Sequence, residues 1–298
     1  MALRTKLAAY FLDLMNGSSS HCWDGLVLGA LERASVLYRK GVEKKYRSYA
    51  DHPERQAWLD AVVISLGNIT VGGTGKTPAA CMLAQRLQRE GYRVALLNRG
   101  YRSQKEHDGA VMSDGRQVLL SAAEGGDEAC LMARSLPGIP VVIGRERRRS
   151  GQIAIEQFGS QVLLLDDGFQ HWQLHRDLDI VLVDATNPFG NGKVLPRGIL
   201  REPMEHLNRA GLFLITKCDQ ASREAIDAVY GTLQAYNPDA PIAESVHRAK
   251  WCISFGDWNG MKGRENCQAL PKGTKAVAVS ALGNPASFEQ TIRSFGYD

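Results

Sequence analysis

The segment GNITVGGTGKTP contains the residue types that bind the phosphates of a nucleotide. Its glycines allow a loop to turn backbone N–H groups inward at a helix N-terminus, where unpaired donors and the helix dipole favour an anion. We expect the Lys76 ammonium to reach the β- and γ-phosphates and the Thr77 hydroxyl to ligate Mg²⁺. The predicted phosphate-binding residues, referred to below as the glycine-rich loop, are Thr70, Val71, Gly72, Gly73, Thr74, Gly75, Lys76 and Thr77.

This loop departs from the P-loop pattern at one position. The pattern places a glycine five residues before Gly75, where this chain has Thr70. An ordinary glycine-rich turn before a helix is the simpler alternative. The flanks favour phosphate binding, because a β-branched apolar run at 62–66 precedes the loop and an apolar-periodic segment resumes at Pro78.

Carboxylates that could complete such a site occur at two places downstream. Asp166 and Asp167 follow the apolar run 161–165, and an acidic residue at the end of a buried strand is the usual second partner of the Mg²⁺ of a nucleotide. Because the carboxyl ends of parallel strands converge on one crevice, we expect Asp166 to meet the glycine-rich loop there. Asp127 begins an apolar-periodic helix, where an acidic residue is also an ordinary complement of the helix dipole.

Strands and helices must alternate to position these residues, and the chain shows that alternation. Apolar runs that suit strands lie at 94–97, 140–144, 161–165, 179–185 and 211–217, and later expected elements are a helix at 222–236, strands near 242 and at 276–280, and a helix from 285. This order predicts an α/β fold with mostly parallel sheets. A Gly- and Pro-rich loop at 187–203 divides the chain into an expected N-terminal unit, 1–200, and a smaller C-terminal α/β unit, 201–298.

Composition excludes several other classes of protein. With 44% hydrophobic and 23% charged residues the chain is typical of soluble globular proteins, and a net charge of +4 is too small to indicate nucleic acid without a basic patch. The six cysteines form no CxxC pair, which indicates a reducing compartment. Asp13 interrupts the apolar N-terminal segment and no clean cleavage site follows, so no signal peptide is expected.

Two basic segments each allow two interpretations. Helices are expected at 3–15 and 26–46, and the second carries apolar residues at helical spacing beside arginines and lysines. It is either a surface helix docked on the core or a peripheral membrane anchor, and the residues alone favour docking. The arginine-rich run 145–149 is a solvated helix start or, alternatively, part of a site for a phosphate-bearing substrate.

Six blocks occur in an order that resembles a known family. GNITVGGTGKTP, NRGYRS, GDEACLMA, LLLLDDGFQHWQLHRDLDIVLVDA, NPFGNGKVLPRGILREP and ITKCD are similar to the motifs of tetraacyldisaccharide 4′-kinases, the lipid A 4′-kinases of Gram-negative bacteria. The similarity runs from about residue 68 to 219 and more faintly to 284. Thr70 also stands at the irregular position in this family.

The resemblance implies a reaction, a fold and a location. The reaction is ATP- and Mg²⁺-dependent transfer of phosphate to the 4′-hydroxyl of a tetraacyldisaccharide 1-phosphate, the lipid A precursor. The implied fold is two-lobed, α/β/α and P-loop NTPase-like, with N-terminal helices that face the cytoplasmic side of the inner membrane. The basic helix around 33–47 then favours binding at that membrane surface, since the acyl chains of the substrate do not leave the bilayer readily.

Site residues carry over from the resemblance one by one. The glycine-rich loop binds ATP, Lys76 stabilises charge on the γ-phosphoryl group, and Thr77 with Asp166 and Asp167 holds Mg²⁺ directly or through water. Asp127 of the GDE motif matches the catalytic aspartate, which orients the attacking hydroxyl and takes its proton. Further positions match residues that line the family cleft without an assigned task, namely Arg99, Arg201 and Glu202.

The sequence departs from the family pattern at one place, and two alternative functions stay open. The family continues to an Asp-His segment whose histidine is coupled to the catalytic aspartate, and none of His171, His175 and His247 stands at the matching place. The C-terminal unit is therefore expected to be cut short, and an ATP-binding remnant without full activity is one rival. A nucleotide-switch GTPase is the other, because ITKCD resembles the guanine-reading NKxD motif, with Lys217 to stack on the base and Asp219 to pair with it.

Overall fold

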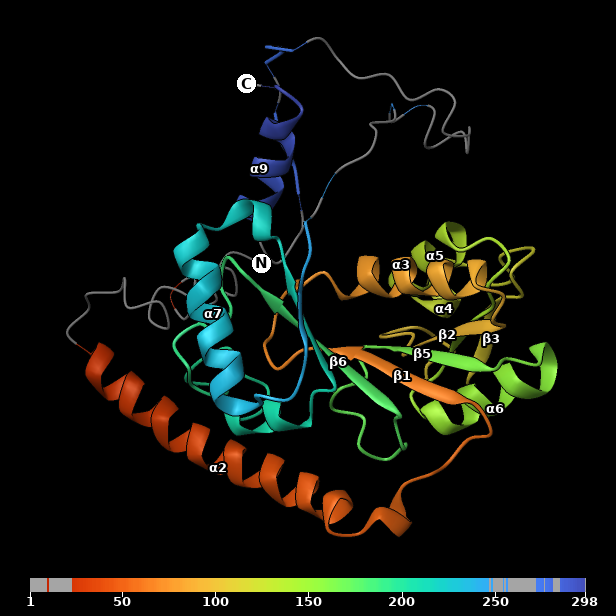
Figure 1. The fold of residues 1–298 in the computed structure, drawn as a ribbon, viewed down its shortest axis with the longest axis horizontal. Coiled ribbons are helices and arrows are strands. Elements are labelled where there is room, and N and C mark those ends of the chain that lie inside the picture. Colours follow the sequence, from red (N-terminus) through yellow and green to blue (C-terminus); the bar gives the residue numbers. More distant parts are fainter. Residues whose placement is uncertain are drawn as a thin grey trace.

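The computed structural model of the chain describes residues 10, 23–246, 248, 254, 256, 272–275, 277–280 and 285–297. Within this part of the chain, eight strands form one sheet in the order β3-β4-β2-β5-β1-β6-β7-β8 (Figure 1). Neighbouring strands are parallel except for β3 with β4. The strands are β1 (Val62–Gly67), β2 (Val94–Asn98), β3 (Ala110–Ser113), β4 (Val141–Ile143), β5 (Val162–Asp166), β6 (Leu178–Asp184), β7 (Leu212–Thr216) and β8 (Ile242–Glu244).

Helices cover both faces of this sheet. The α-helices are α2 (Asp24–Ala50), α3 (Lys76–Arg89), α4 (Ala122–Gly125), α5 (Asp127–Ser135), α6 (Arg147–Phe158), α7 (Arg223–Tyr236) and α9 (Pro285–Ser294), and the short 3-10 helices are η1 (Pro53–Arg55), η2 (Met204–Arg209) and η3 (Cys218–Gln220). Figure 1 shows α3, α4 and α5 on one side of the sheet and α6 on the other. The molecule is thus layered helix, sheet, helix.

The core follows from strands that are apolar on both faces, as parallel strands must be when helices cover both sides. Leu66, Leu96 and Leu164 pack with α3 and α5, whereas Val63 and Leu163 pack with α6 on the opposite face. A further cluster joins β6 and β7 to the apolar side of α7. β2 and β5 are buried along their whole length, which explains their continuous apolar sequences.

The arrangement of β1 places functional segments together. β1 lies between β5 and β6, and its Leu66 is paired in register with Asp166 at the end of β5. The loop that follows β1 and the acidic end of β5 therefore share one edge of the sheet, as the sequence predicted. The expectation of an α/β fold with a mostly parallel sheet is confirmed.

Some expected elements differ from the structure. The edge strand β3 is not among the strands expected from the sequence, and its register with β4 shifts between Val111 and Ser113. Residues 277–280 form no strand, although one was expected at 276–280. The expected helix at 3–15 lies outside the described residues apart from Tyr10. The division at residue 200 stays a prediction; β7 and β8, which follow it, continue the same sheet.

Helix α2 runs along the rim of the molecule and buries few side chains (Figure 1). Its inner side is anchored by polar contacts, because the Ser35 hydroxyl donates to the Val194 carbonyl at 2.8 Å and the Tyr38 hydroxyl to the Arg201 carbonyl at 2.9 Å. Leu37, which the apolar spacing would turn inward, is instead 71% exposed, as is Leu26 at 82%. No described helix is both long and apolar enough to span a bilayer.

Candidate active site

The glycine-rich loop connects the end of β1 to the start of α3. Gly72 and Gly75 have φ of 119° and 83°, which glycine adopts without strain. Across the described residues, the backbone N–H groups of Gly72, Gly73, Thr74 and Gly75 donate to no protein acceptor. With the unpaired amides in the first turn of α3, they make a row of donors that fits an anion such as a nucleotide phosphate.

Thr70, the irregular position of the loop, has a structural task. Its side chain is buried, and its hydroxyl accepts a 3.0 Å hydrogen bond from the Asn68 amide, which also donates to the Thr70 carbonyl at 2.9 Å. The strand entering the loop is fixed further, since the Arg201 N–H donates to the Ile69 carbonyl at 2.7 Å. A glycine at 70 would lose the hydroxyl contact. Asn68, which sequence reasoning did not select, is thus central to the loop.

Lys76 is held in place by two oxygens. Its ammonium donates to the Asn68 side-chain oxygen at 3.0 Å and lies 3.5 Å from an Asp167 carboxylate oxygen. The same Asp167 oxygen accepts from the Arg201 guanidinium at 2.7 Å. Burial acts to raise the pKa of Asp167, but the charges of Arg201 and Lys76 prevail and lower it below its ordinary value. Asp167 is therefore an ionised partner of two cations.

Asp166 is in a different state from its neighbour. It is 3% exposed, one carboxylate oxygen accepts from the Asn98 amide at 3.1 Å, and the other has no hydrogen-bond partner. Burial, followed by the nearby charges of Asp167 and Glu128, raises the pKa of Asp166 to about 7. A buried carboxylate oxygen without a partner is suited to a divalent cation, so Asp166 fits the predicted Mg²⁺ site.

The other predicted metal ligands, Thr77 and Asp167, fit a Mg²⁺ ion that is bound partly by the protein and partly by phosphate oxygens. Thr77 is the second residue of α3 and half-buried, while Asp167 is already engaged by Lys76 and Arg201. The described residues contain no group of three or more His, Cys, Asp or Glu side chains that could hold a metal. Mg²⁺ commonly uses one or two carboxylates together with substrate phosphates, so this sparse donor set is adequate.

The raised pKa of Asp166 predicts a pH-dependent affinity for Mg²⁺. Below about pH 7 the buried carboxyl keeps a proton that the cation must displace, so the dissociation constant is expected to rise by up to about tenfold per pH unit as the pH falls. The sign is opposite for stability without metal. The unfolded carboxyl ionises near pH 4 and the folded one near pH 7, so the free energy of unfolding decreases as pH rises between about 4 and about 7.

Isothermal titration of Mg²⁺ in the presence of ADP, from about pH 6 to about pH 8, checks the first dependence, and urea unfolding over the lower range checks the second. Asp166→Asn cannot ionise and is expected to weaken Mg²⁺ binding and to remove both pH dependences. A dissociation constant for the native chain that stays flat across this range would contradict the prediction.

Asp127 lies at the same edge of the sheet. It is the first residue of α5 and is exposed. Gly126, just before it, lies against Gly100, since an added Cβ would be 3.4 Å from the Gly100 backbone, and the start of α5 is therefore near the end of β2. The negative charge of Glu128, in the same turn, contributes to the raised pKa of Asp166. Asp127 is thus exposed at the start of a helix whose second residue, Glu128, interacts electrostatically with Asp166.

Arg147 belongs to the arginine-rich run 145–149, which the sequence allowed to be either a solvated helix start or part of a site for a phosphate-bearing substrate. The cluster 145–149 divides: Arg147 is 4% exposed, whereas its neighbours Arg148 and Arg149 face solvent. Burial lowers the pKa of Arg147 to about 10, and the charges of Asp166 and Asp167 oppose that shift. Its Nε has no hydrogen-bond partner. A buried positive charge is therefore close enough to the two aspartates to interact with them electrostatically.

Arg201 and Glu202 acquire tasks from the structure. Arg201 pairs with Asp167, as described above, while Glu202 is fully buried and accepts from His206 at 2.7 Å and from Arg209. Gln170 donates to Glu202 and, at 2.8 Å, to the Asn68 carbonyl. This chain of contacts supports the Asn68 that holds Lys76. Arg99 instead pairs with Glu106 at 2.7 Å.

Two of the histidines considered at the sequence level, His171 and His175, are described, and neither is paired with Asp127. Burial, followed by the charges of Arg147 and Arg176, lowers the pKa of His171 to about 3, so it stays neutral near pH 7. His175 stacks on Trp58 with ring centroids 3.5 Å apart. His247 lies outside the described residues.

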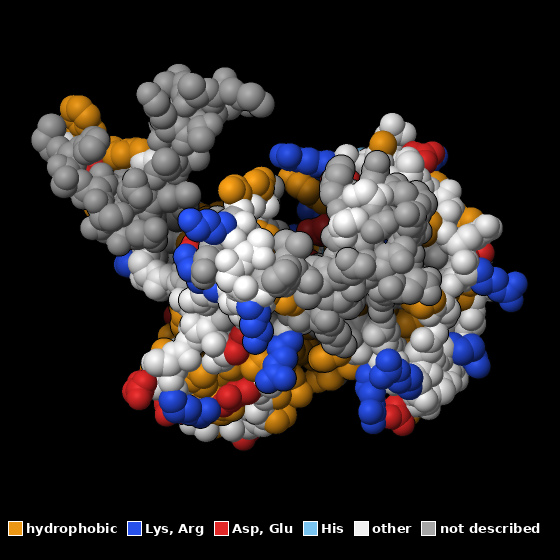
Figure 2. Space-filling model, turned by 90° about the horizontal axis from the view of Figure 1, so that it is seen from above, with side chains coloured by type: hydrophobic (Ala, Val, Ile, Leu, Met, Phe, Trp, Pro, Cys, Tyr) orange, Lys and Arg blue, Asp and Glu red, His pale blue; other side chains and the backbone are white. Residues whose placement is uncertain are grey.

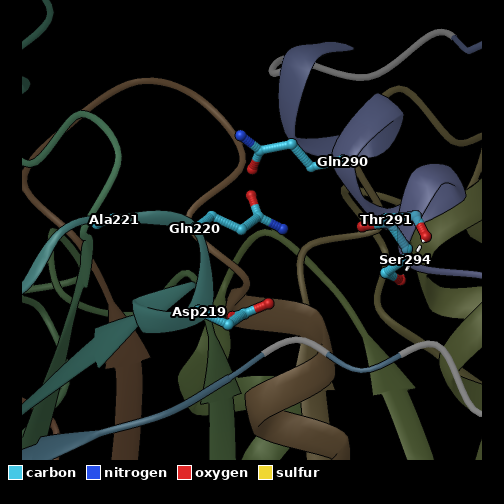
Figure 3. A pocket seen from close by; sticks show the side chains of 6 residues that line it. All are labelled: Asp219, Gln220, Ala221, Gln290, Thr291 and Ser294. Atoms are coloured by element: carbon cyan, nitrogen blue, oxygen red, sulfur yellow. Dashed lines mark hydrogen bonds between the residues drawn. The ribbon is translucent and has the colours of Figure 1, made fainter.

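Two hollows accompany this edge of the sheet. On the face shown in Figure 2, acidic and basic side chains lie within a hollow near the centre of the molecule. A pocket of about 410 Å³ lies between η3 and α9, and Gln220 and Gln290 point toward one another across it (Figure 3). Its other lining residues are Asp219, Ala221, Thr291 and Ser294. The polar lining suits a polar group and does not suit an acyl chain.

A buried strand, a glycine-rich loop with free amides, a helix and a buried aspartate on the adjacent strand together define a P-loop NTPase-like protein. The family model described as "Tetraacyldisaccharide-1-P 4'-kinase" (LpxK) matches residues 28–298. The chain therefore belongs to the tetraacyldisaccharide 4′-kinase family. This confirms the family, and with it the kinase class, that the sequence motifs indicated.

Individual relatives agree with this assignment. A tetraacyldisaccharide 4′-kinase of Halothermothrix orenii is 38% identical over 299 residues, covering 99% of this chain and 78% of the relative. One of Anaeromyxobacter sp. (strain Fw109-5) is 42% identical, covering 92% of this chain and 72% of the relative. The crystal structure of the "apo" form of LpxK from Aquifex aeolicus in complex with ATP superposes with a TM-score of 0.68 at 28% identity, covering 91% of this chain and 79% of that one.

Proposed function

We propose that this protein transfers the γ-phosphoryl group of ATP to the 4′-hydroxyl of a tetraacyldisaccharide 1-phosphate, a step of lipid A biosynthesis. The observation that carries the proposal is the row of unpaired loop amides beside Lys76 and the unpartnered carboxylate oxygen of Asp166. In a chain of this family, that arrangement binds a triphosphate and its cation.

Each site residue has a part in this reaction. The loop amides bind the phosphate oxygens, and Lys76 places a positive charge at the γ-phosphoryl group, where charge is redistributed during transfer. Asp166 is the better direct ligand for Mg²⁺, with Thr77, because Asp167 is already paired with Lys76 and Arg201. When bound, Mg²⁺ neutralises phosphate charge. Arg147 adds a buried positive charge next to the aspartates.

Asp127 acts on the acceptor in this proposal. Phosphoryl transfer depends mostly on positioning and electrostatics, and a carboxylate near the sugar hydroxyl orients it and takes its proton. The exposed position of Asp127 in the first turn of α5 leaves room for a bulky acceptor to approach.

The function is tested by incubating the full chain with γ-labelled ATP, Mg²⁺ and tetraacyldisaccharide 1-phosphate in detergent micelles. Labelled lipid phosphorylated at the 4′ position is expected, with ATP preferred over GTP as the donor. Absence of labelled lipid from a preparation that still binds ATP would defeat the kinase proposal and favour the ATP-binding remnant. Preference for GTP without any lipid product would favour the nucleotide switch.

We also propose that α2 lies on an anionic membrane surface, at the cytoplasmic face of the inner membrane, where the acyl chains of the substrate reside. Exposed apolar side chains, including Leu26 and Leu37, share the outer side of α2 with basic residues. Such a surface gains from burial of apolar area and from attraction to anionic lipid. The exposed basic residues on α2 that carry this proposal are Arg33, Lys40, Lys44 and Arg47.

Replacement of these four basic residues by glutamine is expected to weaken binding to vesicles that contain anionic lipid by at least about tenfold, because each basic residue near such a surface contributes about 1 kcal/mol. Sedimentation with vesicles of phosphatidylglycerol and phosphatidylethanolamine measures the effect. A matched control removes four exposed basic residues elsewhere, Lys105, Arg89, Arg116 and Arg134. Equal losses in both variants would attribute binding to net charge and contradict the role of α2.

A further inference from the structure

We infer that Thr216 and Lys217, at the end of β7, position the glycine-rich loop from behind by fixing two of its carbonyl groups. They are positioning residues rather than catalytic ones, since their side chains contact the loop carbonyls and Asp184. The inference rests on the proposed function only in that the loop binds phosphate. The inference assigns a structural role to the ITKCD segment, which has no role in the proposed reaction.

Lys217 is buried against the back of the loop. Its side chain is 5% exposed, and its ammonium donates to the Gly73 carbonyl at 3.1 Å and pairs with the Asp184 carboxylate. Its backbone has a φ of 58°, an uncommon conformation for a residue other than glycine. This turn at the end of β7 places the side chain beside the loop.

Asp184 fixes the ammonium from the neighbouring strand. It ends β6 and is paired in register with Thr216 of β7. Its other carboxylate oxygen accepts from the Thr186 hydroxyl at 2.6 Å and from the Thr186 N–H at 2.9 Å. Both carboxylate oxygens are thus engaged, and Lys217 has one defined position.

Thr216 holds the next carbonyl of the loop. Its hydroxyl donates to the Thr74 carbonyl at 3.0 Å, and its methyl group lies against Gly75, where an added Cβ would come within 3.8 Å. Thr216, the last residue of β7, and Lys217, which follows it, therefore bind adjacent carbonyls of the loop.

The planar trans peptide converts these contacts into an orientation of donors. In such a peptide the C=O of one residue and the N–H of the next point in opposite directions. Holding the Gly73 carbonyl toward Lys217 turns the Thr74 N–H the other way, and holding the Thr74 carbonyl toward Thr216 does the same for the Gly75 N–H. These two N–H groups are among the loop donors without a protein acceptor in the described structure. Thr216 and Lys217, referred to below as the clamp, thus orient two of the amides that are proposed to bind phosphate.

This geometry differs from the guanine-reading interpretation of the same segment. A lysine that stacks on a base must expose its aliphatic stem, whereas Lys217 as a residue is 4% exposed and its ammonium is engaged by Asp184 and Gly73. The two interpretations predict different ligand dependences. A clamp on the loop acts on any polyphosphate, whereas a base reader acts only on nucleotides.

Thr216→Val tests the clamp with little change in shape, since only the hydroxyl is lost. Its dissociation constants for inorganic tripolyphosphate and for ATP are both expected to rise about five- to tenfold, the loss that corresponds to one hydrogen bond of about 1 to 1.5 kcal/mol. The KM for the lipid acceptor is expected to stay unchanged. Thr232→Val makes the same chemical change on α7, where the hydroxyl donates to the Ala228 carbonyl, and is expected to leave both affinities unaltered.

The double variant Lys217→Met with Asp184→Asn removes the buried ion pair without leaving a lone buried charge. The dissociation constants for ATP and for tripolyphosphate are both expected to rise by about tenfold or more. Hydrogen bonds from charged groups contribute more than hydrogen bonds between neutral groups. Unchanged tripolyphosphate affinity in Thr216→Val, with the melting temperature of the free protein retained, would overturn the inference. Weaker ATP binding with unaltered tripolyphosphate binding would instead make the segment a base reader. Failure of lipid phosphorylation by the native chain would defeat the kinase proposal and leave this test in force.

Discussion

Replacement of Asp127 by asparagine is expected to lower kcat for phosphorylation of tetraacyldisaccharide 1-phosphate by about 10²- to 10⁴-fold, the range that a positioned general base contributes. Asparagine keeps the size of the side chain but cannot take the proton of the sugar hydroxyl. Affinity for ATP is expected to stay unchanged, because the proposed mechanism assigns the phosphates to the loop amides and Lys76 and assigns the acceptor to the exposed Asp127.

Single-turnover phosphorylation and calorimetric titration of ATP separate these two effects. Asp239→Asn is a suitable control, because Asp239 is an exposed aspartate in the turn after α7 and lies outside the site. A variant at Asp127 that keeps more than about a tenth of the native kcat would contradict its role as a base. An increase in KM for ATP at constant kcat would make Asp127 a binding residue instead.

The sequence predicted the strand, loop and helix around the glycine-rich loop because each part has a strong local signal. The β-branched run before Asn68 suits a buried parallel strand, and Gly72 and Gly75 have the positive φ values that other residues avoid. The meeting of the loop with Asp166 followed from topology alone, since parallel strands bring their carboxyl ends to one edge.

The states of the two aspartates could not be predicted from the sequence. Asp166 and Asp167 are adjacent in the chain, yet burial raises the pKa of Asp166 to about 7 whereas Arg201 and Lys76 lower that of Asp167. The difference arises from residues distant in the chain that only folding brings near. Asp167 also has a φ of 55°, so the backbone turns between the two side chains.

The burial of Lys217 and Arg147 could not be predicted from the sequence for a related reason. Each is a basic residue in a segment whose local pattern allows exposure, and only tertiary contacts bury it. Arg147 alternates with exposed Arg148 and Arg149 because α6 presents it to the core together with Ser150 and Ala154. The helical spacing of small residues after Arg147 was the available signal. For Lys217 no comparable signal exists, because its partner Asp184 ends a different strand.

The side of α2 that packs on the protein also could not be predicted from the sequence. Its apolar residues recur at helical spacing, which favours an inward apolar side, but the side that packs on the protein is held by Ser35 and Tyr38 through hydrogen bonds to loop carbonyls. Leu37 is left outside. Periodicity predicts that a helix has an apolar side without saying whether protein or lipid covers it.

Replacement of Lys76 by methionine is expected to reduce both kcat and ATP affinity. Loss of a charged donor aimed at the transferring group costs about 10²- to 10³-fold in kcat. The affinity for ATP is expected to fall by about 10- to 100-fold, since a hydrogen bond from a charged group contributes about 1.5 to 3 kcal/mol. Methionine fills the space of the aliphatic stem, which is largely buried, so stability is affected less than by alanine.

Asn68→Ala distinguishes the charge of Lys76 from its placement. It keeps the ammonium but removes the oxygen that holds it at 3.0 Å and the amide that fixes Thr70. If placement matters as the structure indicates, this variant loses kcat to a smaller extent than Lys76→Met, because Asp167 still attracts the ammonium. Lys105→Met, at an exposed lysine away from the loop, serves as the control. Native kcat and ATP affinity in Lys76→Met would contradict phosphate binding by the glycine-rich loop, because no other lysine of the loop could replace its charge.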